Sequence, residues 1–137
     1  PISKQFAYRL NLYGGITIGE DLPQFYQYRL GGIFEQNIVN FKSFSGFYFA
    51  QLNTNNVVFA SNDLQFKFYK NFFLSGNFTF ANLSDDITFE DAVKVNYSSL
   101  GGTIGYKSPF GQIKFNFSHS LKNNQKGIFS VILGHWF

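Results

Sequence analysis

The sequence contains no cysteine, which excludes disulfide bonds and thiolate metal sites. No run of ~18 apolar residues occurs either, and this excludes a transmembrane helix. Charged residues make up only 14% of the chain, against roughly 25% in ordinary soluble domains. The basic residues are scattered, so the net charge of +3 does not indicate a nucleic-acid partner. Methionine is absent and the chain begins with Pro1, so we expect a leader or a longer N-terminal region before it.

Aromatic residues, in contrast, are abundant: they make up 21% of the 137 residues, with 20 Phe and 8 Tyr. This much apolar surface must be buried or covered by something other than water. Without a spanning helix, closed β-structure is the remaining way to satisfy every backbone group inside a lipid bilayer. We therefore expect a single β-barrel domain or barrel segment over residues 1–137.

Apolar and polar residues alternate through almost the whole chain, which is typical of strands with two different faces. The clearest alternation lies in residues 72–83. Strands of about ten residues match the ~9–11 residues that a tilted strand needs to cross the hydrocarbon layer. The fold class predicted is all-β, an antiparallel up-and-down transmembrane β-barrel. Eight strands are expected, at about residues 5–18, 25–34, 43–52, 57–69, 72–83, 97–107, 112–121 and 127–137.

The last predicted strand ends the sequence on an aromatic residue. It resembles the C-terminal strand of bacterial outer-membrane β-barrel proteins, in which a final Phe and alternating apolar residues form the signal read by the barrel-assembly machinery. The resemblance implies the outer membrane of a Gram-negative bacterium as location, with outer-membrane lipid and the assembly machinery as partners. The residues that carry this signal are Phe129, Val131, Leu133, His135 and Phe137.

The turn lengths support the same arrangement. With the C-terminus on the periplasmic side, the connections alternate between the two sides of the membrane, and the longest one, 84–96, falls outside the cell, as transmembrane barrels prefer. The external connections would be 19–24, 53–56, 84–96 and 122–125, and the periplasmic ones 35–42, 70–71 and 108–111.

Two glycine-rich motifs give a narrower resemblance. The first is Tyr28-Arg29-Leu30-Gly31-Gly32 followed by Phe44-Ser45-Gly46-Phe47, and the second runs from Gly101-Gly102 through Gly105 to Gly111. They are similar to the barrel of the outer-membrane surface-antigen superfamily, which includes assembly factors and the C-terminal barrels of patatin-like phospholipases. The resemblance implies a sixteen-stranded barrel, of which this chain would be the C-terminal half, and it allows other outer-membrane subunits or a second copy as partners.

Basic residues on the predicted inward faces indicate whether the chain is a complete small barrel or part of a larger one. These are Arg9, Arg29, Lys67 and Lys114, whereas Asp63 is the one acid clearly within a predicted strand. The interior of a closed eight-stranded barrel is filled by side chains, and charges buried there should be paired. The pattern therefore favours part of a wider barrel over a complete small one.

Catalytic patterns are missing. No Gly-x-Ser-x-Gly turn occurs, so no serine hydrolase site is expected in this segment, and no cofactor is predicted. His119 and His135 fall near opposite ends of their predicted strands, which disfavours a shared metal site. The acidic stretch around Asp85 and Asp91 lacks the spacing of a calcium loop and is interpreted as a solvated loop.

The leading hypothesis is thus an outer-membrane barrel segment that acts as anchor, scaffold or pore wall and is not an enzyme. Two alternatives stay open: a complete eight-stranded outer-membrane barrel, and a soluble up-and-down barrel that holds a hydrophobic ligand inside. Alternation alone does not decide which face points outward.

Overall fold

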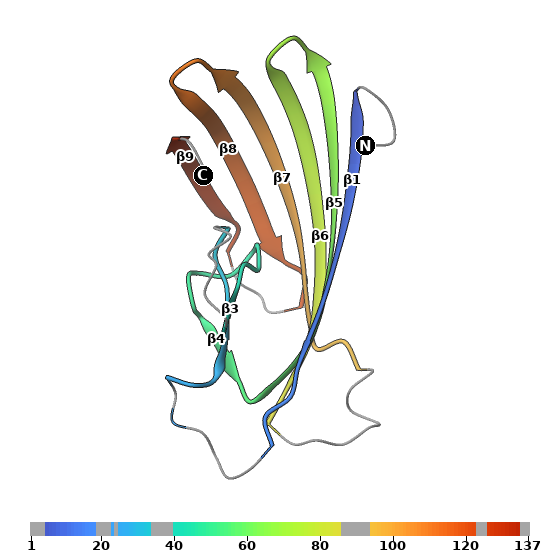
Figure 1. The fold of residues 1–137 in the computed structure, drawn as a ribbon, viewed down its shortest axis with the longest axis vertical. Helices are drawn as coiled ribbons and strands as arrows, with labels where there is room; N and C mark the ends of the chain where they lie inside the picture. The colour runs from blue at the N-terminus through green and yellow to red at the C-terminus, as the bar shows by residue number, and fades with distance from the viewer. Residues whose placement is uncertain are drawn as a thin grey trace.

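The computed structural model describes residues 5–18, 23, 25–33, 40–85, 94–122 and 126–134. Within these residues nine strands form two sheets, one of six strands and one of three (Figure 1). No helix in the described part is long and apolar enough to cross a membrane.

The six-stranded sheet is a meander in which every neighbouring pair is antiparallel. Six of the eight predicted strands are found in it, close to their expected bounds, and they confirm the all-β antiparallel fold class. In order across the sheet they are β1 (Phe6–Gly15), β5 (Asn56–Tyr69), β6 (Phe72–Ser84), β7 (Tyr97–Ser108), β8 (Gly111–Ser120) and β9 (Ile128–Gly134).

The two tight turns of this sheet, at 70–71 and 108–111, lie at the same end of the strands. We call this end of the sheet the hairpin edge. The beginning of β1 and the end of β9 lie there too (Figure 1). The connections from β1 to β5, from β6 to β7 and from β8 to β9 leave from the opposite edge, the loop edge. The short turns and the long connections are therefore on opposite sides, as predicted.

The predicted strands 25–34 and 43–52 are wrong as wall strands. This part of the chain forms a separate small sheet of β2 (Tyr28–Leu30), β3 (Phe41–Lys42) and β4 (Leu52–Thr54), in which β2 and β3 are parallel. The physical reason is the backbone at Gly31, Gly32 and Gly46, whose φ angles of +136°, +75° and +86° end an extended run. Of the predicted connection 35–42, residues 35–39 lie outside the described residues and 40–42 belong to the small sheet.

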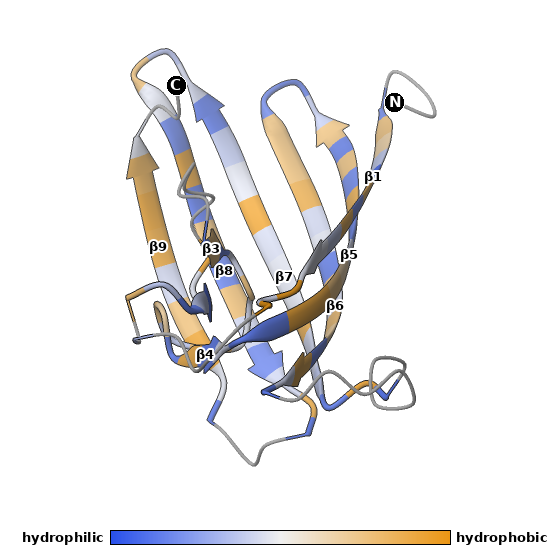
Figure 2. Ribbon diagram, turned by 60° about the horizontal axis from the view of Figure 1, so that its bottom comes forward, coloured by the Kyte–Doolittle hydropathy of each residue, from blue (hydrophilic) through white to orange (hydrophobic). Residues whose placement is uncertain are grey.

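We call the described residues 25–33 and 40–55 the inserted segment, because they stand in the chain between β1 and β5. Figure 2 shows this segment in front of one face of the six-stranded sheet. Its contacts reach five wall strands: Tyr28 packs on Tyr13 of β1, Phe44 on Phe59 of β5, and Phe47 on Tyr97 of β7. Ser45 contacts β6 and Gly46 contacts β8. A single short segment can touch all of these strands because the sheet curves around it, so the covered face is concave.

The sheet is open. Within the described residues β1 and β9 are its two outer strands and do not pair with each other. The described residues therefore do not form a closed eight-stranded barrel, which was one of the alternatives. The expectation of about eight wall strands is corrected to six, since the other two predicted strands lie in the inserted segment.

Candidate functional site

The convex face of the sheet is apolar and exposed. Strand alternation places one set of side chains on this face, and most of its large apolar members are between 36% and 72% exposed. A soluble barrel that carries a hydrophobic ligand has the reverse arrangement, with the apolar side chains inside. The convex residues include Phe6, Leu10, Leu12, Leu64, Phe66, Leu74, Phe78, Leu100, Ile104, Phe115, Phe117, Phe129, Val131 and Leu133.

Aromatic rings gather on the sheet next to the turn at 70–71. The ring of Phe72 lies 4.7 Å from that of Tyr106 and 6.1 to 6.4 Å from those of Phe68 and Tyr69, measured between centroids. Such a cluster at the end of an apolar band is typical of the aromatic girdle of a membrane barrel. Tyr97 lies on the concave face against Phe47 and does not belong to this cluster.

The concave face is divided into three zones from the loop edge to the hairpin edge. The zone nearest the loop edge is apolar and packs on the inserted segment through Val57, Phe59 and Ala81. The zone nearest the hairpin edge is basic. The middle zone consists of small polar side chains, most of them buried: Ser61, Asp63, Asn77, Thr79, Ser99, Asn116, Ser118 and Ser120.

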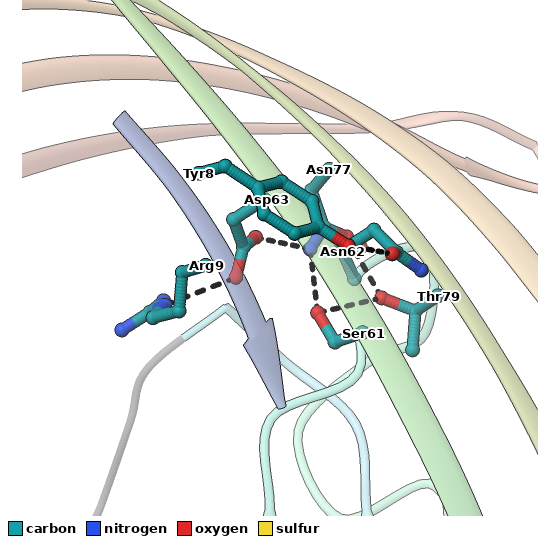
Figure 3. A network of polar contacts seen from close by, with 8 residues as sticks. Tyr8, Arg9, Ser61, Asn62, Asp63, Asn77 and Thr79 are labelled. Atoms are coloured by element: carbon teal, nitrogen blue, oxygen red, sulfur yellow. Dashed lines mark hydrogen bonds and ion pairs between the residues drawn. The ribbon is translucent and has the colours of Figure 1, made fainter. Parts of the chain in front are cut away.

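Asn77 is at the centre of the middle zone (Figure 3). Its side-chain nitrogen donates to Ser61 Oγ at 3.0 Å and to Asp63 Oδ1, and Asp63 Oδ2 accepts from Arg9 Nε at 3.1 Å. Its side-chain oxygen accepts from Thr79 Oγ1 at 2.9 Å and from Ser45 Oγ at 2.6 Å. Since Ser45 belongs to the inserted segment, one amide joins that segment to β5 and β6 directly, and to Arg9 of β1 through Asp63.

Gly46 brings the inserted segment into direct contact with the wall backbone. A Cβ atom at this position would lie 2.9 Å from the carbonyl carbon of His119 and from the nitrogen of Ser120, and 3.0 Å from Cβ of Ser99. With a φ of +86°, the position also disfavours any residue with a side chain. Ser45 and Gly46 together therefore form the seat of the inserted segment on β6, β7 and β8.

The other motif glycines mostly permit close packing. A Cβ at Gly31 would overlap the carbonyl oxygen of Tyr48, one at Gly105 would overlap the ring of Phe73, and one at Gly111 would meet the backbone of Gly134. Gly32 and Gly101 have neighbours at 3.4 Å. Gly102 lies on the convex face with no neighbour within 4 Å, and nothing in the structure explains it.

Three of the four predicted inward basic residues, Arg9, Lys67 and Lys114, lie on the concave face of the wall, as their register with Asp63, Phe73 and Gly105 shows. Arg29 does not lie on the wall. It belongs to β2 of the small sheet, where its guanidinium carbon is 5.8 Å from the ring centroid of Phe25.

The predicted C-terminal signal is described in part. Phe129, Val131 and Leu133 share the convex face of β9, with exposed fractions of 64%, 50% and 71%. His135 and Phe137 lie outside the described residues. The role of these five residues in assembly stays a prediction.

In the described part of the chain no three His, Cys, Asp or Glu side chains are grouped so that they could hold a metal ion. Of the acidic stretch, Asp85 is described and accepts a hydrogen bond from the backbone nitrogen of Asn55 at 3.3 Å, whereas Asp91 lies outside the described residues. The polar centre of this chain is therefore the concave network around Asn77, which alternation alone did not single out.

Replacing Asn77 with alanine is expected to lower the free energy of unfolding by about 1–3 kcal/mol, because several buried or half-buried partners lose their hydrogen bonds together. Denaturant titration of the reconstituted protein measures this change. Ser75→Ala on the same strand and face is the matched control, since the side chain of Ser75 makes no hydrogen bond within the described residues. Equal stability of the two variants would contradict a central role for Asn77.

The family model described as the OMP85 superfamily matches residues 1–137. No curated protein and no solved structure matches the chain.

Proposed function

Since the chain belongs to the OMP85 superfamily of outer-membrane β-barrel proteins, we propose that it is the C-terminal part of a sixteen-stranded barrel wall and is not itself catalytic. In this proposal the chain contributes six wall strands and the inserted segment. The observation that carries it is the open sheet with an exposed apolar convex face and a polar concave face. Only a closed sheet satisfies its edge strands in lipid, so the wall needs further strands beside β1 and β9.

The two faces of the sheet have different roles in this proposal. The convex side chains contact lipid, and the aromatic cluster of Phe72 and Tyr106 lies at the periplasmic membrane interface. The concave face lines the lumen, where the network around Asn77 holds the inserted segment. The segment acts as a scaffold inside the barrel, because its core residues Leu30, Phe44 and Phe47 are at most 2% exposed.

A finer placement within the superfamily rests on the glycine motifs. The hairpin from Gly101 to Gly111 and the motif at Gly31, Gly32 and Gly46 are similar to the barrels of surface antigens and patatin-like phospholipases, and we propose that the chain belongs to that group. A hydrolase activity would then belong to another region of the longer protein. The proposed location is the outer membrane of a Gram-negative bacterium, with the barrel-assembly machinery as a partner during insertion.

Membrane extraction tests the proposal. In membranes of the native host, we expect the polypeptide that contains this chain to stay in the pellet after washes with high salt and carbonate, and to need detergent for release. Its denatured mass should be well above the 15.7 kDa of this chain. Release into buffer as a monomer would contradict the membrane location, and a native mass near 15.7 kDa would contradict the larger barrel.

A further inference from the structure

One polar pair interrupts the apolar convex face. Asn62 of β5 shares this face with Leu64, and the hydroxyl group of Tyr8 on β1 donates to the side-chain oxygen of Asn62 at 2.6 Å (Figure 3). The other neighbours of Asn62 on this face are apolar. They are Leu10 and Phe78 across the two strand pairings, and Ala60 and Leu64 along β5. The convex face therefore presents an amide group in surroundings that suit lipid.

The amide lies near the middle of the apolar band. Asn62 precedes Phe68, a member of the aromatic cluster beside the turn at 70–71, by six residues of β5. At ~3.3 Å per residue and a strand tilt of ~40°, this separation corresponds to ~15 Å of depth, and the apolar band of a membrane barrel is ~25 Å tall. The hydrocarbon core contains no water that could form hydrogen bonds with the amide at this depth.

The hydrogen-bonding groups of Asn62 are only partly used. Its side-chain amide has two N–H donors and two acceptor positions on the oxygen, and Tyr8 occupies one acceptor position. Within the described residues the side-chain nitrogen donates no hydrogen bond, and a donor without a partner is costly in hydrocarbon. A further wall strand beside β1 would lie two strand spacings, or ~10 Å, from β5. A partner for the nitrogen therefore has to approach the convex face from outside the wall.

We propose that a second copy of the protein is this partner, in a dimer whose two-fold axis runs along the membrane normal beside Asn62. Both copies then have the same orientation in the membrane, and a residue close to the axis meets its own copy at the same depth. Each Asn62 nitrogen donates to the oxygen of the other amide, at the acceptor position that Tyr8 leaves open. Hydrogen bonds between polar side chains also hold membrane helices together. The inference rests on the proposed function, since it requires that the convex face contacts lipid.

Two glycines beside the polar pair allow the copies to approach closely. Gly76 of β6 and Gly102 of β7 are register partners on the convex face, and a Cβ atom at either position would have no neighbour within 4 Å. They lie in the row of Leu64, ~7 Å from the row of Asn62. Because Asn is shorter than the Leu and Phe side chains around it, the two amides meet only where those side chains find room. The hollow at the glycines provides such room for a side chain of the second copy.

Cysteine cross-linking of the full-length native protein in its membrane tests the inference. The 137 residues contain no cysteine, so Asn62→Cys introduces a single thiol into this part of the protein. A disulfide needs Cα atoms within ~7 Å of each other, which residues close to the axis satisfy. After mild oxidation we expect a disulfide-linked species of twice the polypeptide mass, above the background of the unsubstituted protein. Val131→Cys is the matched control, because Val131 is on the same face but four strand spacings, or ~19 Å, from β5, and it should not cross-link.

Asn62→Leu gives a second reading, because it removes the amide and keeps a side chain of similar size. In detergent, the dissociation constant of the dimer, measured by analytical ultracentrifugation, should rise about tenfold. The stability of the monomer should not fall, which distinguishes a contact between copies from a structural role within the wall. A monomer in membrane and detergent alike, a dissociation constant that Asn62→Leu does not change, or equal cross-linking at positions 62 and 131 would overturn the inference. If membrane extraction still behaves as expected in those cases, the barrel assignment stands and only the dimer fails.

Discussion

Replacing Gly46 with valine is expected to release the inserted segment from the wall. The new Cβ would lie 2.9 Å from backbone atoms of His119 and Ser120, which cannot move without breaking the pairing of β8. The φ of +86° adds a cost of ~1–2 kcal/mol for a residue with a side chain, and the forced contact adds ~1–3 kcal/mol. The hydrogen bond from Ser45 to Asn77 would be lost with the seat. Limited proteolysis of the membrane-inserted protein, with cleavage sites mapped by mass spectrometry, should show rapid cutting between residues 40 and 55.

Gly102→Val is the matched control for this substitution, because a side chain at Gly102 meets nothing within 4 Å and points away from the lumen. The control should leave the inserted segment protected. If Gly46→Val were protected equally well, the segment would be held by something other than its seat on β6, β7 and β8.

Two adjacent residues of β5 test which face of the sheet contacts lipid. Leu64→Arg is expected to lower the free energy of unfolding far more than Gln65→Arg. Leu64 lies on the convex face and is 46% exposed, whereas Gln65 lies on the concave face. An arginine on the lipid face near the bilayer midplane costs ~2–4 kcal/mol, and one in the lumen keeps its contact with water. Reversible unfolding of the reconstituted variants measures the difference in free energy, and the yield of membrane-inserted protein gives an independent reading.

Comparing these two variants shows directly which face of the sheet contacts lipid. If Gln65→Arg were the more destabilising of the two, the concave face would be the one in contact with apolar surroundings, and the membrane orientation of the sheet would be reversed. Since both substitutions introduce the same side chain one residue apart, strand propensity and net charge cannot explain a difference between them.

The wall strands were predictable because each has a face that repeats every second residue and a turn that marks its end. In β6, Leu74 and Phe78 alternate with Ser75 and Asn77, and β8 shows the same order. The turns at 70–71 and 108–111 then fix which strands are neighbours. Local sequence therefore determines both the strand and its partner in this part of the chain.

The inserted segment was not predictable in the same way, because aromatic residues can alternate in a packed core as well as on a lipid face. Phe44 and Phe47 are buried against Phe59 and Tyr97, contacts with residues distant in the sequence that periodicity does not encode. Gly31 and Gly46 were recognised as a motif, yet their positive φ angles, which end the extended conformation, are visible only in the structure.

The network around Asn77 was missed for a related reason. Alternation placed Asn77 and Thr79 on the less apolar face of their strand, but Asn and Ser residues in such positions are commonly solvated. Their importance depends on Ser45 arriving from the inserted segment.

The position of the inserted segment also has a consequence for the order in which the chain folds. From β5 to β9, the hairpins at 70–71 and 108–111 and the connections between β6 and β7 and between β8 and β9 bring together strands that are close in sequence. Pairing β1 with β5, in contrast, closes a connection of about 40 residues, at an entropic cost ~3 kcal/mol higher than that of a two-residue turn. Contacts between residues close in sequence form faster than contacts across long loops. The meander from β5 to β9 should therefore form first, and β1 should join it last, once the inserted segment has packed on the wall and shortened the effective length of the loop.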